Sequence, residues 1–128
     1  MPAPKPARNL KNLRPFDLVY ETVIKIPEGK VSTYGDISRR INKRLSAAAV
    51  GWAMNALGSD KNESKYNSDN VPWHRVINSK GKLSTHHESA QLSDDGKPVK
   101  LQRVLLEKEG VRFTDDESVD LNIYLWTD

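Results

Sequence analysis

The sequence contains no cysteine, and this absence excludes several kinds of chemistry. Disulfide bonds, iron–sulfur clusters, thiolate-ligated zinc and a cysteine nucleophile all require a residue that the chain lacks. No apolar run approaches the ~20 residues that a membrane-spanning helix needs, and no charged start leads into the apolar stretch of a signal peptide. We therefore expect a soluble protein that uses neither a membrane nor a thiol.

The length of 128 residues fits a single domain whose charge is unevenly spread. Residues 1–60 carry a net charge of +5, residues 61–110 carry +2 and residues 111–128 carry −4. A basic front half favours a surface that faces a polyanion, although ordinary solvated charge explains the same pattern. The basic, proline-rich stretch 1–14 is predicted to be a flexible arm, and residues 15–128 are predicted to be one domain.

Apolar residues at helical spacing predict about four helices, with proline, glycine and N-capping residues at their ends. The predicted helices are residues 15–26, 34–41, 46–57 and 98–109. The second and third, joined by the basic turn 42–45, form a candidate helix-turn-helix. Helix pairs are common in proteins, so this motif alone does not establish DNA binding.

Turn and loop signals account for most of the remaining chain. Residues 75–77 and 82–84 flank the turn sequence Asn-Ser-Lys-Gly and predict a small β-hairpin, or wing. Residues 58–70 contain one aromatic and no aliphatic side chain, which predicts a mobile surface loop. Residues 85–97 are predicted to be irregular, and residues 121–128 to cover the core as an extended segment. The predicted fold class is mainly α, a winged helix-turn-helix-like bundle of about four helices with a small β-hairpin.

Four separated motifs resemble the DNA-binding domain of the O6-alkylguanine-DNA alkyltransferase family. They are IPEGKVSTYGDIS (26–38), AVGWAMNAL (49–57), VPWHRVINSKG (71–81) and LLEKEGV (105–111). The family reads Pro-Cys-His-Arg-Val where this chain reads Pro-Trp-His-Arg-Val, and its cysteine accepts the alkyl group. With Trp73 in that place, the chain is similar to the alkyltransferase-like proteins. The resemblance runs from about residue 16 to residue 113.

This resemblance implies lesion binding without repair. Alkyl transfer needs an activated thiolate, and an indole is not a usable nucleophile at neutral pH. What remains is to extrude a base and enclose it. Trp73 would then form a wall of the pocket, whereas a tryptophan after proline is otherwise more often a core or lid residue. The implied lesion pocket comprises Trp73, Tyr34, Pro72, Val71, His86 and Ser84.

The resemblance also implies that His74 and Glu109 are the remnants of a proton relay. With no thiol to deprotonate, we expect them to form a buried hydrogen-bonded pair that shapes the pocket. For Arg75 we weigh two roles equally. One is structural, through backbone carbonyls or Asn78, and the other is a contact with a DNA phosphate.

We expect the helix-turn-helix to bind the minor groove of DNA and the wing to contact the DNA backbone. The resemblance implies that Tyr34 crowds a phosphate, and the backbone N–H groups at the start of this helix favour an anion there. The alternative is that Tyr34 packs on the hairpin. Small residues on the second helix of the helix-turn-helix, the recognition helix, allow it to approach the DNA minor groove closely. The alternative is that they allow tight packing between helices. The predicted contacts are Thr33, Tyr34, Gly35, Arg39, Arg44, Ala47, Ala48, Gly51, Lys80 and Lys82, with Arg40 and Lys43 beside them.

Two positions depart from the family pattern. The family usually has an arginine where this chain has Ala48, and that side chain fills the gap left by the extruded base. His86 stands where alkyltransferase-like proteins can carry a lesion-sensing arginine. The pair His86 and His87 is a candidate metal site, but adjacent histidines rarely chelate one ion, so we expect neither a metal nor another cofactor.

We therefore expect a monomeric, non-catalytic protein that recognises O6-alkylguanine in double-stranded DNA. By family analogy it signals to nucleotide excision repair proteins, and it acts in the nucleus of a eukaryote or otherwise in the cytoplasm. Two alternatives stay open. A winged-helix DNA-binding regulator would bind lesion-bearing and normal duplexes equally, and a hydrolytic enzyme using His74, Glu109 and water would release the alkyl group.

Overall fold

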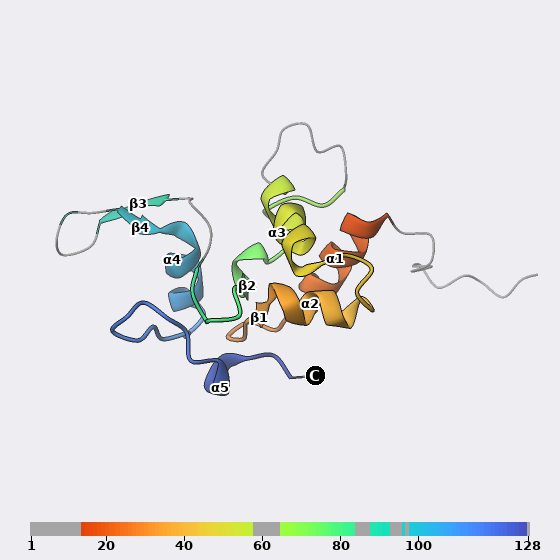
Figure 1. Ribbon diagram of the computed structural model, residues 1–128. Helices are drawn as coiled ribbons and strands as arrows, with labels where there is room; N and C mark the ends of the chain where they lie inside the picture. Colours follow the sequence, from red (N-terminus) through yellow and green to blue (C-terminus); the bar gives the residue numbers. More distant parts are fainter. Residues whose placement is uncertain (1–13, 58–64, 84–87, 93–95, 97, 128) are drawn as a thin grey trace, which may run out of the picture.

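Three N-terminal helices pack around one apolar core (Figure 1). They are α1 (Pro15–Ile24), α2 (Tyr34–Arg40) and α3 (Ala47–Ala56). The hydroxyl of Tyr20 on α1 donates a 2.7 Å hydrogen bond to the carbonyl of Ala53 on α3, and burial raises the pKa of Tyr20 to about 12. The computed structural model describes residues 14–57, 65–83, 88–92, 96 and 98–127, so residues 1–13 of the expected arm lie outside it.

Capping side chains fix where α2 and α3 begin. The Oγ1 of Thr33 accepts a 3.0 Å hydrogen bond from the backbone N–H of Asp36, and the Oγ of Ser46 accepts one of 3.1 Å from Ala49. Between the helices, Asn42 and Lys43 adopt left-handed φ angles of 57° and 59°, which reverse the chain within a few residues. The predicted helix-turn-helix is therefore formed.

The predicted β-hairpin at residues 75–77 and 82–84 is wrong. Strand β2 (Val76–Ile77) instead pairs in parallel with β1 (Ser32–Thr33), and Lys82 bridges Ser118. A turn remains, since the N–H of Asn78 donates to the carbonyl of Lys82 at 3.1 Å. The pairing partners come from segments distant in the sequence, which local turn signals do not reveal. Ser84 lies outside the described residues.

A second group of elements surrounds α4 (Leu101–Lys108), the fourth predicted helix. Strands β3 (Glu88–Leu92) and β4 (Pro98–Lys100) pair antiparallel beside it, so the expectation that residues 85–97 are irregular is wrong for β3. Pro98 begins the strand rather than the helix, a position that tolerates its missing N–H. Gly110, with a φ of 93°, ends α4 as predicted.

The C-terminal segment forms a helical turn before it becomes extended. Helix α5 (Leu121–Tyr124) replaces part of the predicted extended stretch because the side chain of Asp120 caps it by accepting from the N–H of Asn122. Beyond it, the N–H of Trp126 donates to the carbonyl of Val31 at 2.7 Å, and the indole is buried. This segment does cover the core, as the sequence predicts.

Tyr66 corrects the prediction of a mobile loop at residues 58–70. Residues 58–64 lie outside the described part, but the Tyr66 side chain is buried against α1, with its ring 5.3 Å from that of Tyr20. Its hydroxyl donates a hydrogen bond to the carboxylate of Glu21. The single aromatic of the stretch thus anchors the chain that leads to Trp73.

Two apolar cores result, one among α1, α2 and α3 and one around Leu106 of α4. The short helix η2 (Trp73–Arg75) runs directly into β2 and contacts α4 (Figure 1). In the residues that the structure describes, no helix is both long and apolar enough to cross a bilayer.

Candidate nucleic-acid interface

A cavity of about 720 Å³ is lined by residues of α3, η2 and α4. This volume lies within the ~300–1,000 Å³ typical of small-molecule sites. Four of the predicted pocket residues line it, namely Tyr34, Val71, Pro72 and Trp73. The other two, Ser84 and His86, lie outside the described residues. The remaining lining residues are Ile24, Met54, Asn55, Leu57, Ser68, Asp69, Asn70, His74, Arg75, Leu101 and Leu105.

Trp73 is half-buried, with one side packed on the helical core and another on the cavity. Its indole meets the His74 ring edge-on, at 6.1 Å between centroids and 87° between planes. The side chain is therefore not enclosed in the core, the main structural alternative for this residue. An aromatic wall beside a cavity of this size suits a planar heterocyclic ligand.

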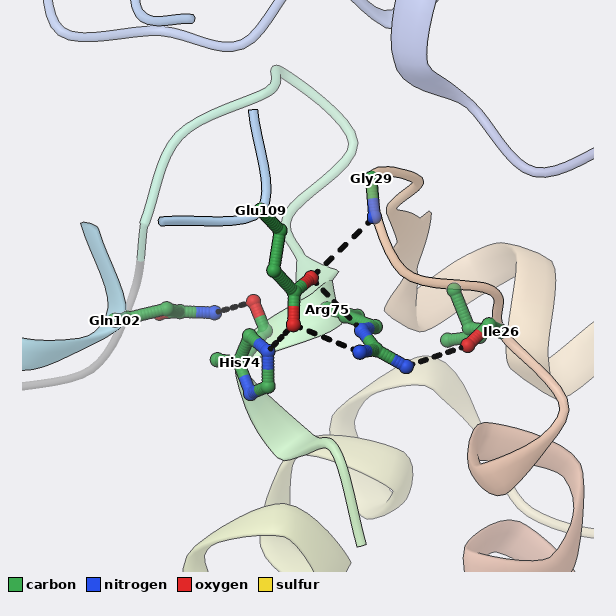
Figure 2. Close-up of polar contacts among 6 residues, drawn as sticks. All are labelled: Ile26, Gly29, His74, Arg75, Gln102 and Glu109. Carbon is green, nitrogen blue, oxygen red and sulfur yellow. Dashed lines mark hydrogen bonds and ion pairs between the residues drawn. The ribbon is translucent and has the colours of Figure 1, made fainter. Parts of the chain in front are cut away.

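His74 and Arg75, which line the cavity, bind the carboxylate of Glu109, and the backbone N–H of Gly29 is its third donor (Figure 2). The Oε2 of Glu109 is 2.8 Å from the Nε2 of His74, so the expected pair is formed. Arg75 donates to both carboxylate oxygens, from Nε at 2.9 Å and from Nη2 at 2.7 Å, and its Nη1 donates to the carbonyl of Ile26 at 2.8 Å. The N–H of Gly29 donates to Oε1 at 3.4 Å.

Arg75 uses all three guanidinium nitrogens within the protein, and its side chain is mostly covered. This geometry favours the structural role over the phosphate contact. Its carbonyl partner is that of Ile26, and Asn78 instead accepts from the backbone N–H groups of Lys80 and Lys82, each at 2.9 Å.

The buried amide of Gln102 on α4 holds the same segment from the other side (Figure 2). Its Nε2 donates to the carbonyls of His74, at 3.0 Å, and Val76, at 2.8 Å. The prediction missed this residue. The only sequence signal for its role was that Gln102 is a polar residue one position into a helix whose inward-facing residues are mostly apolar.

Charge is balanced within the network. Burial alone would raise the pKa of Glu109, but hydrogen bonds from Arg75 and His74 outweigh it and hold the pKa at about 2. Burial lowers the pKa of His74 below its ordinary value, against the opposing effect of Glu109. At neutral pH, a neutral imidazole therefore donates its Nε2 proton to an ionised carboxylate that also pairs with Arg75.

The half-buried ring of Tyr34, at the start of α2, lines the cavity and packs on the core of α1, α2 and α3. Gly51 on α3 faces it, because a β-carbon added to Gly51 would lie 3.9 Å from Cε1 of Tyr34. Gly35 is exposed, with open space around its α-carbon. Thr33 is buried and its hydroxyl caps α2, so Tyr34 and Gly35 are the accessible residues of this predicted group.

The exposed face of α3 begins with the predicted Ala47 and Ala48 and continues to Trp52 and Asn55. The prediction did not single out Trp52 or Asn55. Helical spacing could have identified them from the sequence, since positions 48, 52 and 55 lie on the same side of the helix as Gly51. Asn55 also lines the cavity, so the exposed face of α3 adjoins the cavity at this residue.

The predicted phosphate-binding cations differ in their exposure and in their contacts within the protein. Lys43 and Arg44 are exposed, and Arg39 pairs with Asp36 although its side chain is 70% exposed. Arg40 is engaged in the fold, since its Nε donates to Asp36 at 2.9 Å and its guanidinium lies 3.6 Å from the ring centroid of Trp126. Arg40 is therefore not a candidate for a phosphate contact.

The turn at residues 78–82 presents two cations. Lys80 and Lys82 are both exposed, and the ammonium of Lys82 donates to the carbonyl of Asp116 at 3.2 Å. Gly81 is required here, because its φ is 79° and a β-carbon would lie 2.4 Å from the carbonyl oxygen of Val119.

No three histidine or carboxylate side chains gather in a manner that could hold a metal ion, within the residues that the structure describes. His86 and His87 fall outside that part of the chain.

Comparison with known proteins agrees with this arrangement. The family model described as 6-O-methylguanine DNA methyltransferase, DNA binding domain, matches residues 15–111. Alkyltransferase-like protein 1 of Schizosaccharomyces pombe is 38% identical over 115 residues, which cover 87% of this chain and 93% of that protein. The DNA base-flipping protein of Escherichia coli is 32% identical over 108 residues, covering 84% and 70%.

A solved structure of the S. pombe protein, in complex with damaged DNA containing O6-carboxymethylguanine, superposes with a TM-score of 0.63. It is 37% identical, and the match covers 88% of this chain and 94% of that one. The chain therefore belongs to the family of the 6-O-methylguanine DNA methyltransferase DNA-binding domain and, within it, to the alkyltransferase-like proteins.

Proposed function

We propose that this protein recognises O6-alkylguanine in duplex DNA by rotating the base into the cavity beside Trp73, and that it leaves the alkyl group in place. The observation that carries the proposal is the half-buried indole on the wall of an accessible cavity, next to the helix-turn-helix. The S. pombe relative was solved with damaged DNA, and the E. coli relative is named a base-flipping protein, which supports the same function here.

The chemistry of the cavity supports binding without transfer. The sequence has no thiol, and the indole of Trp73 cannot attack an alkyl carbon at neutral pH. The neutral His74 keeps its proton on the bond to Glu109 and has no nucleophile to serve. Both residues instead hold η2 in place, through Arg75 and the loop that precedes β1.

Small side chains and nearby cations support DNA docking along α3. Ala47, Ala48 and Gly51 are small residues on α3, so the DNA backbone can approach the helix closely at these positions, beside the larger exposed side chain of Trp52. Arg39, Lys43 and Arg44 lie at or near the turn that precedes α3, where phosphates would flank the groove. Neutralising phosphates releases counterions, which makes such binding salt-dependent.

A stable, unrepaired complex marks the lesion for other proteins. We propose that the protein acts as a monomer and presents the bound lesion to nucleotide excision repair, in the nucleus if the organism is a eukaryote. This step rests on the family analogy rather than on a contact in the structure.

The test compares two duplexes that differ by one methyl group, O6-methylguanine against guanine, by fluorescence anisotropy. We expect tighter binding to the methylated duplex, and with a methyl label we expect all label to stay on the DNA. Equal affinities would favour a winged-helix regulator without lesion preference. Label appearing in solution or on the protein would favour an enzyme.

A further inference from the structure

Trp52 is a large apolar side chain that the fold leaves in solvent. It is 65% exposed, the most exposed of the large hydrophobic residues in the described part of the chain. It lies in the middle of α3, where Ala49, Val50, Ala53 and Met54 supply the buried face. The fold therefore does not use this indole, and keeping it in water costs free energy.

The position of Trp52 relates it to the cavity. It shares the exposed face of α3 with Ala48 and Asn55, four residues before it and three after it. Asn55 lines the cavity, and Gly51 faces the ring of Tyr34, which lines it too. Trp52 thus shares the exposed face of α3 with Asn55, a residue that lines the cavity proposed to receive the extruded base.

Extruding a base leaves a gap in the stack, and proteins that distort DNA from the minor groove often insert an apolar side chain between base steps. The exposed residues in the first turn of α3 are only alanines, Ala47 and Ala48. On the exposed face, Trp52 is the residue whose side chain is long, rigid and able to stack on bases.

We propose that Trp52 inserts into the DNA stack at the position vacated by the extruded base. The inference rests on the proposed function, because the gap exists only if a base is rotated out. The occupant is duplex DNA rather than a protein, since the exposed cations Arg39, Lys43 and Arg44 accompany this face and complement phosphates. The indole stacks on the bases above and below the gap and slows the return of the extruded base.

The experiment measures dissociation constants of the full chain for duplexes with one O6-methylguanine and for matched guanine duplexes. The variants are Trp52→Ala, which removes the stacking surface, and Trp52→Phe, which keeps an aromatic ring. Ile123→Ala, at a 58% exposed residue on α5, controls for the loss of an exposed apolar side chain. Thermal unfolding of each variant checks the fold, which does not depend on this exposed residue.

We expect Trp52→Ala to weaken binding to the methylated duplex by about ten- to a hundredfold, the usual range for losing one base–aromatic stack. The preference of Trp52→Ala for the methylated duplex should also decrease. Trp52→Phe should keep most of the affinity, and Ile123→Ala should bind as the wild type does. Unchanged affinity in Trp52→Ala, or an equal loss on both duplexes, overturns the inference. A wild-type protein without lesion preference instead overturns the proposed function itself, so the two failures are distinguishable.

Discussion

The α-carbon of Gly51 on α3 faces the ring of Tyr34 on α2, and a β-carbon added to Gly51 would meet Cε1 at 3.9 Å. That is an ordinary van der Waals distance, so the packing of the two helices does not require glycine. A glycine inside a helix instead costs about 0.5–1 kcal/mol relative to alanine. We infer that the glycine serves the approach of DNA rather than the fold.

Gly51→Ala should therefore raise the free energy of unfolding by about 0.5–1 kcal/mol while it weakens DNA binding. Urea unfolding and fluorescence anisotropy on the same preparation measure both effects. A loss of stability would show that tight helix packing explains the glycine. Stability gained with affinity unchanged would show that DNA does not approach α3 this closely.

Acid should destabilise the protein through Glu109. Its pKa of about 2 lies below the ordinary 4.5, so the stabilisation is complete above pH 4.5 and is lost as the pH falls toward 2, on the order of 2–3 kcal/mol. The lowered pKa of His74 adds a loss that begins as the pH falls below 6.5, because the unfolded state binds the proton more readily. Urea unfolding at a series of pH values measures both.

Glu109→Gln should lower stability at neutral pH by about 3 kcal/mol, since it leaves Arg75 largely covered without its counter-charge. It should also flatten the acid limb between pH 4.5 and 2. Glu107→Gln, two residues earlier in the last turn of α4 and with a side chain 44% exposed, is the matched control and should change stability by less than about 1 kcal/mol. Identical acid limbs in wild type and Glu109→Gln would contradict the network's assigned role.

Salt should weaken DNA binding, and Arg44 should account for part of the dependence. Arg44→Ala is expected to reduce the slope of log K against log salt by about 1, uniformly for methylated and normal duplexes. Lys25→Ala removes an equally exposed cation at the end of α1 and should leave the slope unchanged. Equal slopes for Arg44→Ala and wild type would remove this residue from the phosphate contacts.

Trp73→Ala should reduce affinity for the methylated duplex by about 1–3 kcal/mol through the loss of a stacking wall, and Trp73→Phe should retain most of it. Anisotropy titrations with both duplexes make the comparison. A loss of the same size on normal DNA would indicate that Trp73 supports the fold of η2 rather than the base.

Ala48→Arg should tighten binding to the methylated duplex by up to a few kcal/mol where the gap in the stack is empty, because a side chain at this position then compensates for unstacking. When Trp52 already fills the gap, the gain should be small in the wild type and larger in Trp52→Ala. A double-mutant cycle measures this coupling. Additive effects would indicate that the two positions do not share one gap.

The helix-turn-helix could be predicted from the sequence because its determinants are local. Thr33 caps α2, and apolar residues such as Ile37 and Val50 recur at helical spacing on the buried faces. The predicted hairpin failed because β2 pairs with β1, more than forty residues earlier, and Lys82 bridges Ser118. No turn signal within residues 75–84 specifies either partner.

The candidate site was predictable to the extent that its residues sit in motifs. Trp73, His74 and Glu109 belong to motifs in which the resemblance assigns them a role. Trp52 and Asn55 lie within the motif at residues 49–57 but receive no role from it, and Gln102 lies outside the four motifs. Their roles depend on which face of a helix is left exposed or turned toward η2, and that is decided by packing between distant segments. The sequence places Tyr66 in a predicted mobile loop, because one buried aromatic in a polar stretch produces no periodic pattern.

The central claim, that the cavity beside Trp73 receives the damaged base, is tested most directly by a crystal structure of the protein bound to a duplex with one O6-methylguanine. The account predicts a methylated purine outside the helical stack, lying against the indole between α3 and α4, with its methyl group intact. A duplex with that base still stacked and the cavity vacant would contradict it.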